Sequence, residues 1–450
     1  MRSVESWLLR SARRRPDHEA FVGTTYRALA AEVDDAARRL WSAGARPGRR
    51  AGLALPPGRP FVVALHGLLR LGAVVVPLDP RLPAAERERR LQGATLAVDA
   101  GTDLGALAPA ADAELLDRHD LDAAAIVVHT SGTSGPAKAI PLTYGNWLWS
   151  ALGSAATLGC PPGERWLCAL PLNHVGGLSV LLRSAIAGTT AVVHEGWDTD
   201  RVLAELRGEL GRPAPTVVSL VPTTLRRLLD AGLRGPGTGT GEAPALRWVL
   251  LGGAAIPGGM LEEAAVAGIP VAPTYGMSEA ASQIATLGPP LFCTHVEIAG
   301  ADGRPTRTPG VTGEVLVSGP TVCREVVGED GRLRTGDLGV LDERGHLAIV
   351  GRSSDTIITG GENVLPLEVE RVLEAQPGVV EAAVFGRPDP EWGERVCARI
   401  VPAPGARIDP EELRRHAALH LLRHQLPREI EVVDVLPRTP SGKLLRRELA

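Results

Sequence analysis

Lysine is almost missing from this sequence. Of 48 basic residues in a chain of 450, only Lys138 and Lys443 are lysines, and the others are arginine. We attribute this bias to nucleotide composition more than to function. A lysine that is kept despite this bias is a candidate for a function that arginine performs poorly. The lysine side chain has a flexible stem and a compact charge, so it can contact several oxygens in turn.

An excess of positive charge and long hydrophobic runs are missing as well. The formal net charge of −4 gives no broad cationic field for nucleic acid or an anionic membrane, so any phosphate site must be local. The most apolar segment, 61–78, is interrupted by His66, Arg70 and two glycines, and it predicts a buried helix followed by a strand. The N-terminus has charges without the apolar stretch of a signal peptide. We expect a soluble, cytoplasmic protein with no integral membrane association and no nucleic-acid partner.

Cysteine pairs are absent too. The five cysteines, at positions 160, 168, 293, 323 and 397, form no CxxC motif and cannot all be bridged among themselves. Reduced, mostly buried thiols are the expectation for a chain in a reducing compartment.

The sequence does contain short β-rich apolar runs, each followed by small residues or by a helical pattern. They lie at 125–129, 190–194, 216–221 and 247–253. Strands that end in glycine loops and alternate with helices indicate an α/β body with largely parallel sheets. Because ligands gather at the carboxyl ends of such strands, we expect the functional site there.

The chain is too long for one compact core, and the pattern changes toward its C-terminus. Closely spaced strands predict a β subdomain at about 290–352. Beyond it, strands and two helices, at 366–376 and 410–422, predict a compact α+β domain. We place the N-terminal domain at 1–352, a connection at 353–355 and the C-terminal domain at 356–450. The glycine-rich stretch 232–244 predicts a flexible surface loop.

A candidate phosphate loop, "HTSGTSGPAK", ends at Lys138. Glycines let backbone N–H groups approach an oxyanion, and hydroxyls and the lysine add donors and charge. The residues are Thr130, Ser131, Gly132, Thr133, Ser134, Gly135 and Lys138. The loop does not match the Walker pattern. A polar glycine-rich turn is the alternative, and the presence of a rare lysine favours the phosphate cradle.

"TSGTSGPAK" resembles the signature of the adenylate-forming superfamily, which includes acyl-CoA synthetases, firefly luciferase and the adenylation domains of peptide synthetases. Further motifs follow in the order of that superfamily. They are "PLNH" (171–174), "LGGAAIP" (251–257), "PTYGMSEAA" (273–281), "RTGDLG" (334–339), "GRSSDTIITGGENVLPLEVE" (351–370) and "PRTPSGK" (437–443). The resemblance implies an α/β fold with a large multi-sheet N-terminal domain and a small mobile α+β C-terminal domain. It also implies an ATP- and Mg²⁺-dependent ligase that converts a carboxylic acid to an acyl-adenylate and passes the acyl group to a thiol such as that of CoA.

The resemblance assigns roles to the nucleotide-binding residues. Glu279 matches the magnesium ligand, Asp337 matches the acceptor of the ribose hydroxyls, and Arg352 lies near the ribose. The adenine is flanked by residues of two motifs, with Ser278 at a position where the superfamily commonly has threonine. These residues are Gly253, Ala254, Ala255, Thr274, Tyr275, Gly276 and Ser278.

Other roles carried by the resemblance concern catalysis and movement. Lys443 matches the C-terminal lysine that bridges the attacking carboxylate and the α-phosphate, and Asp355 matches the hinge pivot. Gly360 and Gly361 would border the pantetheine tunnel. His174 resembles a gate beside the acyl site, although a histidine after "PLN" can equally be a structural hydrogen-bonder.

Segments 170–193 and 275–286 resemble most closely the o-succinylbenzoyl-CoA synthetases of menaquinone biosynthesis. Their substrate is an aromatic keto diacid, whose second carboxylate needs polar partners. Ser282 and Gln283 are candidates, and Arg183 is a weaker one that we interpret as a surface charge. Asn173 departs from the pattern, because an aromatic residue is common there.

Several alternatives stay open. The chain can be another aryl- or fatty acyl-CoA synthetase, a stand-alone adenylating enzyme that loads a carrier protein, or a nucleotide- or acyl-binding protein without turnover. A homodimer is the oligomer we consider, and the sequence does not decide between it and a single chain.

Overall fold

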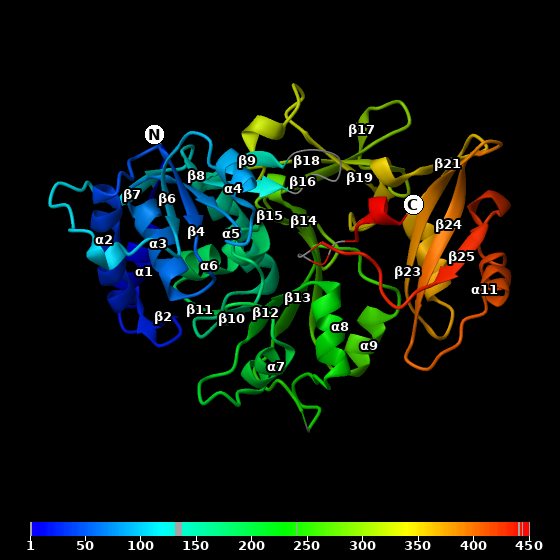
Figure 1. Ribbon diagram of the computed structural model, residues 1–450, viewed down its shortest axis with the longest axis horizontal. Coiled ribbons are helices and arrows are strands. Elements are labelled where there is room, and N and C mark those ends of the chain that lie inside the picture. Colours follow the sequence, from blue (N-terminus) through cyan, green and yellow to red (C-terminus); the bar gives the residue numbers. More distant parts are fainter. Residues whose placement is uncertain (1, 131–136, 240, 440–441, 443, 450) are drawn as a thin grey trace.

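The computed structural model describes residues 2–130, 137–239, 241–439, 442 and 444–449. A large N-terminal part holds three main sheets, and the C-terminal residues form a small part beside it, shown in orange and red in Figure 1. This arrangement confirms the expected mixed α/β class. No helix among the described residues is long and apolar enough to cross a membrane.

The largest sheet has eight strands in the order β15-β14-β13-β12-β10-β11-β2-β3. Its central strands pair in parallel, and the antiparallel β15 and β3 lie at its two edges. The bounds are β2 Glu19–Phe21, β3 Thr24–Thr25, β10 Arg165–Cys168, β11 Thr190–Val193, β12 Val217–Leu220, β13 Trp248–Leu251, β14 Val271–Met277 and β15 Ser282–Thr286. Helices α6 (Val175–Ala187), α7 (Thr199–Arg207), α8 (Pro222–Asp230) and α9 (Met260–Val266) connect its strands. The predicted strands at 190–194, 216–221 and 247–253 are confirmed.

A second sheet of five strands has the order β6-β4-β5-β8-β9. The bounds are β4 Arg50–Ala54, β5 Val74–Pro77, β6 Ala94–Asp99, β8 Ala124–Thr130 and β9 Lys138–Thr143. Helices α3 (Arg59–Arg70) and α4 (Ala84–Arg90) connect its strands, α5 (Tyr144–Leu158) follows β9, and α1 (Trp7–Arg14) and α2 (Tyr26–Ser42) precede β4 in the chain. A short antiparallel pair, β1 (Ser3–Glu5) and β7 (Arg118–Asp120), forms a separate small sheet. Residues of both sheets share one hydrophobic core. The apolar segment 61–78 forms the buried α3 and β5, as predicted.

The third sheet is antiparallel, with the order β17-β16-β18-β19-β20 and its own core. The bounds are β16 His295–Ala299, β17 Pro305–Thr306, β18 Thr312–Ser318, β19 Leu333–Leu341 and β20 Leu347–Arg352. Consecutive strands with short connections produce this sheet, because no helical segment of the chain is available to make parallel crossovers.

The C-terminal part packs two helices on a fourth sheet with a separate core. Its elements are β21 (Ile357–Thr359), β22 (Glu362–Val364), α10 (Pro366–Glu374), β23 (Val379–Asp389), β24 (Gly393–Pro402), α11 (Pro410–Ala417) and β25 (Glu429–Val432). The second helix ends at Ala417, earlier than predicted, and Leu419 and Leu422 beyond it are exposed.

One further expectation needs correction. The stretch 232–244 is not simply a surface loop, because Leu233 and Ala243 are fully buried and anchor both of its ends. The expectation of free, mostly buried cysteines is confirmed, since all five are free and Cys168, Cys323 and Cys397 are buried.

Candidate active site

The loops that follow β13 and β14 meet at the carboxyl edge of the large sheet. The loop after β13 carries Gly253, Ala254 and Ala255, and Gly253 has a φ of +83° that favours glycine. A Cβ on the preceding Gly252 would lie 2.5 Å from the Thr274 carbonyl oxygen. Glycine at this position therefore lets the loop lie directly against β14.

Strand β14 turns back into β15 through a distorted hairpin. A Cβ on Gly276 would collide with the Ser282 carbonyl, and the strand pairing is irregular between Tyr275 and Gly276. Ala281 (φ 52°) and Ser282 (φ 100°) have positive φ although neither is glycine. Such strained backbone costs about 1–3 kcal/mol per residue and concentrates at functional sites.

The strained hairpin holds Glu279 close to the strand that begins at Lys138. Glu279 lies in a short 3₁₀ turn with Ser278, and its backbone oxygen accepts a hydrogen bond of 2.8 Å from the Cys323 N–H. The Cys323 thiol donates in turn to the Pro141 carbonyl in β9, at 3.1 Å. The predicted metal ligand and the strand of the predicted phosphate-binding lysine are thus joined through one residue.

Tyr275, Asp337 and Arg352 form the polar centre of the site. The Tyr275 hydroxyl donates to Asp337 Oδ2 at 2.7 Å, and Arg352 Nε lies 2.7 Å from Asp337 Oδ1. Asp337 and Arg352 face each other across β19 and β20, which explains why residues so far apart in sequence meet. Burial, followed by the nearby Asp337 carboxylate, raises the pKa of Tyr275 well above its usual value, so the phenol stays a hydrogen-bond donor.

The main phosphate-loop prediction falls partly outside the described residues. Thr130 ends β8 and pairs with Lys138 at the start of β9, and the Lys138 side chain is exposed. The other loop residues named above, Ser131, Gly132, Thr133, Ser134 and Gly135, lie outside the described residues, as does Lys443. Their proposed roles stay predictions.

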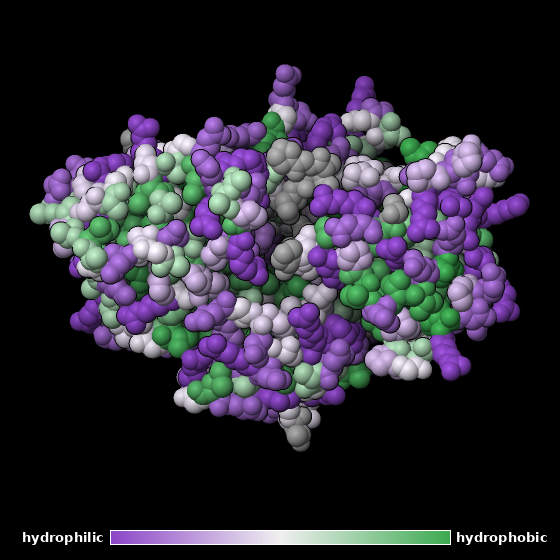
Figure 2. Space-filling view, viewed as in Figure 1, coloured by the Kyte–Doolittle hydropathy of each residue, from purple (hydrophilic) through white to green (hydrophobic). Residues whose placement is uncertain are grey.

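The segment before Lys443 reaches the site from the C-terminal part. In Figure 1 the red trace after β25 runs toward the ends of β13 and β14 and returns, and Figure 2 shows the surface hollowed between the two parts. A Cβ on Gly442 would lie 3.3 Å from Val221 Cγ2, and one on Gly253 would lie 3.4 Å from Val221 Cγ1. Val221 follows β12, so the C-terminal motif is placed beside the predicted adenine loop.

Contacts between the two parts fix this arrangement. The Gly258 N–H donates to Glu374 Oε2 of α10 at 2.8 Å. Burial, which outweighs the backbone hydrogen bonds, raises the pKa of Glu374 to about 7. Arg371 Nη2 donates to the Ile349 carbonyl at 3.0 Å.

Arg446 connects the predicted pivot with the C-terminal domain. Its Nε lies 3.1 Å from Asp355 Oδ2, and its Nη1 lies 2.6 Å from Glu370 Oε1 of α10. Sequence reasoning missed Arg446 and Glu374. One more arginine or glutamate in this composition carries no signal, and only the fold shows what these two contact.

Two groups of predicted residues are not brought to this centre. Gly360 and Gly361, with φ of +60° and +84°, form the turn between β21 and β22, which Figure 1 shows well apart from β13 and β14. A Cβ on Gly360 would lie 2.7 Å from Trp392 Cε3, so packing within the C-terminal domain already explains that glycine. His174 precedes the first residue of α6 and is partly buried.

The interpretation of Arg183 as a surface charge is wrong. Arg183 lies on α6 with 6% exposure, and its Nη2 donates to Ser150 Oγ at 3.3 Å. Ser150 Oγ donates to the Ala281 carbonyl at 2.7 Å, directly before Ser282 and Gln283. Gln283 is fully buried, donates through Nε2 to Thr286 Oγ1 at 2.7 Å and leaves Oε1 without a partner among the described residues.

A magnesium ion fits this set of residues as a partner of the nucleotide. Within the described part of the chain, no group of three or more His, Cys, Asp or Glu side chains could hold a metal ion alone. Mg²⁺ is usually bound through one or two carboxylates together with substrate phosphates. Glu279, at the carboxyl edge of the sheet, can supply such a carboxylate.

A large part and a small one thus meet at a polar centre built from the carboxyl edge of a mostly parallel sheet. The family described as AMP-binding enzyme matches residues 8–326, and the AMP-binding enzyme C-terminal domain matches residues 368–443. The chain therefore belongs to the AMP-binding enzymes, and the expected class of AMP-forming acid–thiol ligases is confirmed.

The relatives narrow the comparison further. The chain is 35% identical over 489 aligned residues to the 2-succinylbenzoate–CoA ligase of Bacillus licheniformis, with 99% of each chain covered. A structure of the o-succinylbenzoate CoA synthetase of Bacillus subtilis with the acyl-adenylate OSB-AMP has a TM-score of 0.88 at 34% identity, covering 100% of this chain and 98% of that one. The complex of that enzyme with ATP and a magnesium ion has a TM-score of 0.87 at 33% identity, covering 100% of both chains.

Proposed function

We propose that the protein ligates o-succinylbenzoate to CoA with ATP, in menaquinone biosynthesis. In the first half-reaction an oxygen of the succinyl carboxylate bonds to the α-phosphorus, the bond to the β-phosphate breaks, and acyl-AMP and pyrophosphate form. In the second, the CoA sulfur bonds to the acyl carbon, AMP leaves and the thiol proton is released. The observation that carries the choice of a diacid is the buried, uncompensated Arg183.

The nucleotide would lie where the loops after β13 and β14 meet. Asp337 would accept hydrogen bonds from the ribose hydroxyls, held in place by the Tyr275 hydroxyl and by Arg352. Gly253 and Gly276 would lie beside the adenine, where the missing side chains permit a positive φ at Gly253 and a close approach of the Ser282 carbonyl at Gly276. Glu279 would hold Mg²⁺, which when bound offsets the negative charge of the phosphates.

The first half-reaction brings an anion toward an anion, so cations must converge on the α-phosphate. We propose Lys138 for the leaving pyrophosphate and Lys443 for the reacting carboxylate. The position of Gly442 beside Val221 supports the second assignment. A rotation of the C-terminal domain about Asp355 would then withdraw Lys443 and bring Gly360 and Gly361 to the thiol path.

The second carboxylate of the substrate would be bound near Arg183. Its guanidinium is buried, and in the described part of the chain it forms no ion pair. Although burial lowers the pKa of Arg183 to about 9, the group is still protonated at neutral pH. A buried cation without a counter-charge is costly, and a substrate carboxylate would offset that cost. Ser150 links Arg183 to the segment of Ser282 and Gln283, which supports placing the acyl pocket between α6 and this segment.

The proposal is tested by measuring pyrophosphate release and CoA thioester formation with a panel of acids. The decisive pair is o-succinylbenzoate and 3-benzoylpropanoate, which differ only in the ring carboxylate. We expect the diacid to have a kcat/KM at least about tenfold higher, which corresponds to one charged hydrogen-bonded contact. In Arg183→Met this preference should disappear, while Arg183→Lys should keep part of it, and thermal unfolding must show that both variants are folded.

Other outcomes point to the alternatives. A panel in which benzoate or fatty acids exceed o-succinylbenzoate would indicate a different acyl-CoA synthetase. Pyrophosphate release without CoA thioester would indicate an enzyme that loads a carrier protein. No pyrophosphate release with any acid would indicate a nucleotide- or acyl-binding protein without turnover.

The proposal also covers the cellular location and the oligomeric state. The five free cysteines support a cytoplasmic location. A homodimer is proposed only as the oligomer to test, by light scattering at working concentration.

A further inference from the structure

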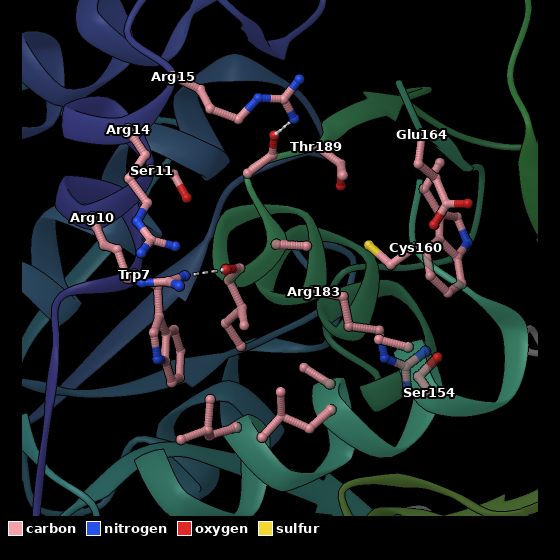
Figure 3. A pocket seen from close by; sticks show the side chains of 18 of the residues that line it. Trp7, Arg10, Ser11, Arg14, Arg15, Ser154, Cys160, Glu164, Arg183 and Thr189 are labelled. Carbon is pink, nitrogen blue, oxygen red and sulfur yellow. Dashed lines mark hydrogen bonds between the residues drawn. The ribbon is translucent and has the colours of Figure 1, made fainter. Parts of the chain in front are cut away.

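A separate cavity of about 610 Å³ lies at the far end of α6 from His174. It is bounded by α1, α5, the last residues of α6 and the start of β10 (Figure 3). Because α6 has 13 residues, about 20 Å separate its two ends. Tyr275, Asp337 and Glu279 do not line the cavity, so it is distinct from the nucleotide site. Its volume is typical of small-molecule sites.

One wall of the cavity carries only positive charge. Arg10 and Arg14 of α1, and Arg15 directly after it, line it in Figure 3. Arg10 and Arg15 donate to the carbonyls of Ile186 and Gly188 at the end of α6, at 3.2 and 2.5 Å. These partners are neutral, so they leave the three positive charges uncompensated.

Arg13, on the same helix, differs from these three arginines because it forms an ion pair. Arg13 points elsewhere and pairs with Glu5 at 2.5 Å. Over the ranges that the structure describes, Arg10, Arg14 and Arg15 form no such ion pair. The acidic residue that lines the cavity, Glu164, is already paired with Arg247. The cavity therefore has a net positive charge with no internal counter-ion.

The rest of the lining is apolar. The apolar lining residues are Trp7 from α1, Leu148 and Ala151 from α5, Ile186 from α6 and Trp166 from β10. The Arg183 side chain runs past this surface, and Figure 3 shows its guanidinium turned toward Ser154. An apolar surface beside a cluster of unpaired guanidiniums suits a ligand that is apolar at one end and anionic at the other.

We propose that this cavity binds a small amphipathic carboxylate. The carboxylate would lie against Arg10, Arg14 and Arg15, where guanidiniums can form charge-assisted hydrogen bonds. The apolar body would lie between the two tryptophans and α5. Arg183 also lines the cavity, so the cavity adjoins the proposed acyl pocket while it is distinct from the nucleotide site. The carboxylate proposed here would contact the arginines at positions 10, 14 and 15 and not Arg183.

Cys160 provides a direct readout. It is an exposed free thiol, and in Figure 3 its sulfur points into the cavity. A bound ligand should shield it from iodoacetamide, and peptide mass spectrometry separates its modification from that of the other cysteines. We would use 2-naphthoate and octanoate as probes, with 2-naphthalenemethanol and octanol as neutral counterparts, on the full chain without ATP.

At saturation, at least one carboxylate should slow the modification of Cys160 at least fivefold. Its neutral counterpart should need about tenfold higher concentration for the same protection, as expected for one charge-assisted contact. The carboxylate that protects at the lower concentration identifies the body as aromatic or aliphatic.

Variants locate the binding site. In Arg14→Ala the half-protecting concentration should rise about tenfold, and Arg14→Lys should restore much of the affinity. Arg13→Ala changes the net charge equally on the same helix and should leave protection unchanged. Arg14 makes no hydrogen bond within the described residues, so its removal should not disturb the fold, which thermal unfolding checks.

Three outcomes would overturn the proposal. One is that neither carboxylate protects Cys160. Another is that a neutral counterpart protects as well as its carboxylate. The third is that Arg14→Ala and Arg13→Ala behave alike, because the probe would then bind elsewhere.

Discussion

The replacement Asp337→Asn tests how the site holds the ribose. Asp337 is 8% exposed, accepts the Tyr275 hydroxyl at 2.7 Å and lies 2.7 Å from Arg352 Nε. Asparagine keeps the shape and one acceptor oxygen but loses the charge and the second acceptor. A hydrogen bond to a charged group contributes about 1.5–3 kcal/mol. We therefore expect the KM for ATP to rise between about tenfold and a hundredfold.

The replacement should weaken ATP binding without lowering the stability of the fold. The remaining amide oxygen can still accept from Tyr275, and Arg352 is 43% exposed, so its ion pair contributes little to stability. The assay is pyrophosphate release with ATP varied at saturating acid, together with thermal unfolding. Asp342→Asn is the matched control, since Asp342 lies directly after β19 and accepts backbone hydrogen bonds in the exposed turn that follows. A KM for ATP within twofold of the wild type would refute the ribose assignment.

Three further predictions concern the C-terminal domain. Burial raises the pKa of Glu374 to about 7 and outweighs the Gly258 N–H, which favours the carboxylate, so the buried position of Glu374 between the two parts should be most stable below about pH 4.5 and lose stability as the pH rises through 7. Glu374→Gln should therefore raise the ratio of adenylation rates at pH 8 and pH 6, and an unchanged ratio would contradict this. Arg446→Met removes the link to Asp355 and should lower adenylation at least about tenfold without an equal loss of thioester formation from supplied acyl-adenylate. Lys443→Arg should impair adenylation in the same selective way, and equal loss of both half-reactions would refute a role confined to that step.

Local patterns in the sequence predict most of the secondary structure. The runs at 125–129, 190–194, 216–221 and 247–253 become β8, β11, β12 and β13, because β-branched apolar residues between glycine-rich turns leave few other conformations. The segment 410–422 fails as one long helix. The helix ends at Ala417, and Leu419 and Leu422 beyond it are exposed. The amino-acid composition of this segment does not show where burial ends.

Some functional residues can be predicted from sequence motifs, and others become visible only in the fold. Motifs locate Tyr275, Glu279 and Asp337, because their chemistry is tied to the residues beside them in the chain. Arg183 and Arg446 could not be singled out in a sequence so rich in arginine. Their roles follow from burial and from partners more than thirty residues away, such as Ser150 and Glu370.

The sequence by itself determined the family, the order of the elements and the residue types that the chemistry requires. A short glycine-rich loop of the phosphate-binding type and two lysines in an arginine background are local properties visible in the sequence. Only the tertiary structure decided that β19 and β20 bring Asp337 to Arg352, that the C-terminal segment returns to Val221, and that three arginines of α1 and the residue after it line one cavity. The physical reason is that electrostatic interactions and burial depend on which residues are close in space. Local sequence patterns do not show which residues far apart in the chain come into contact.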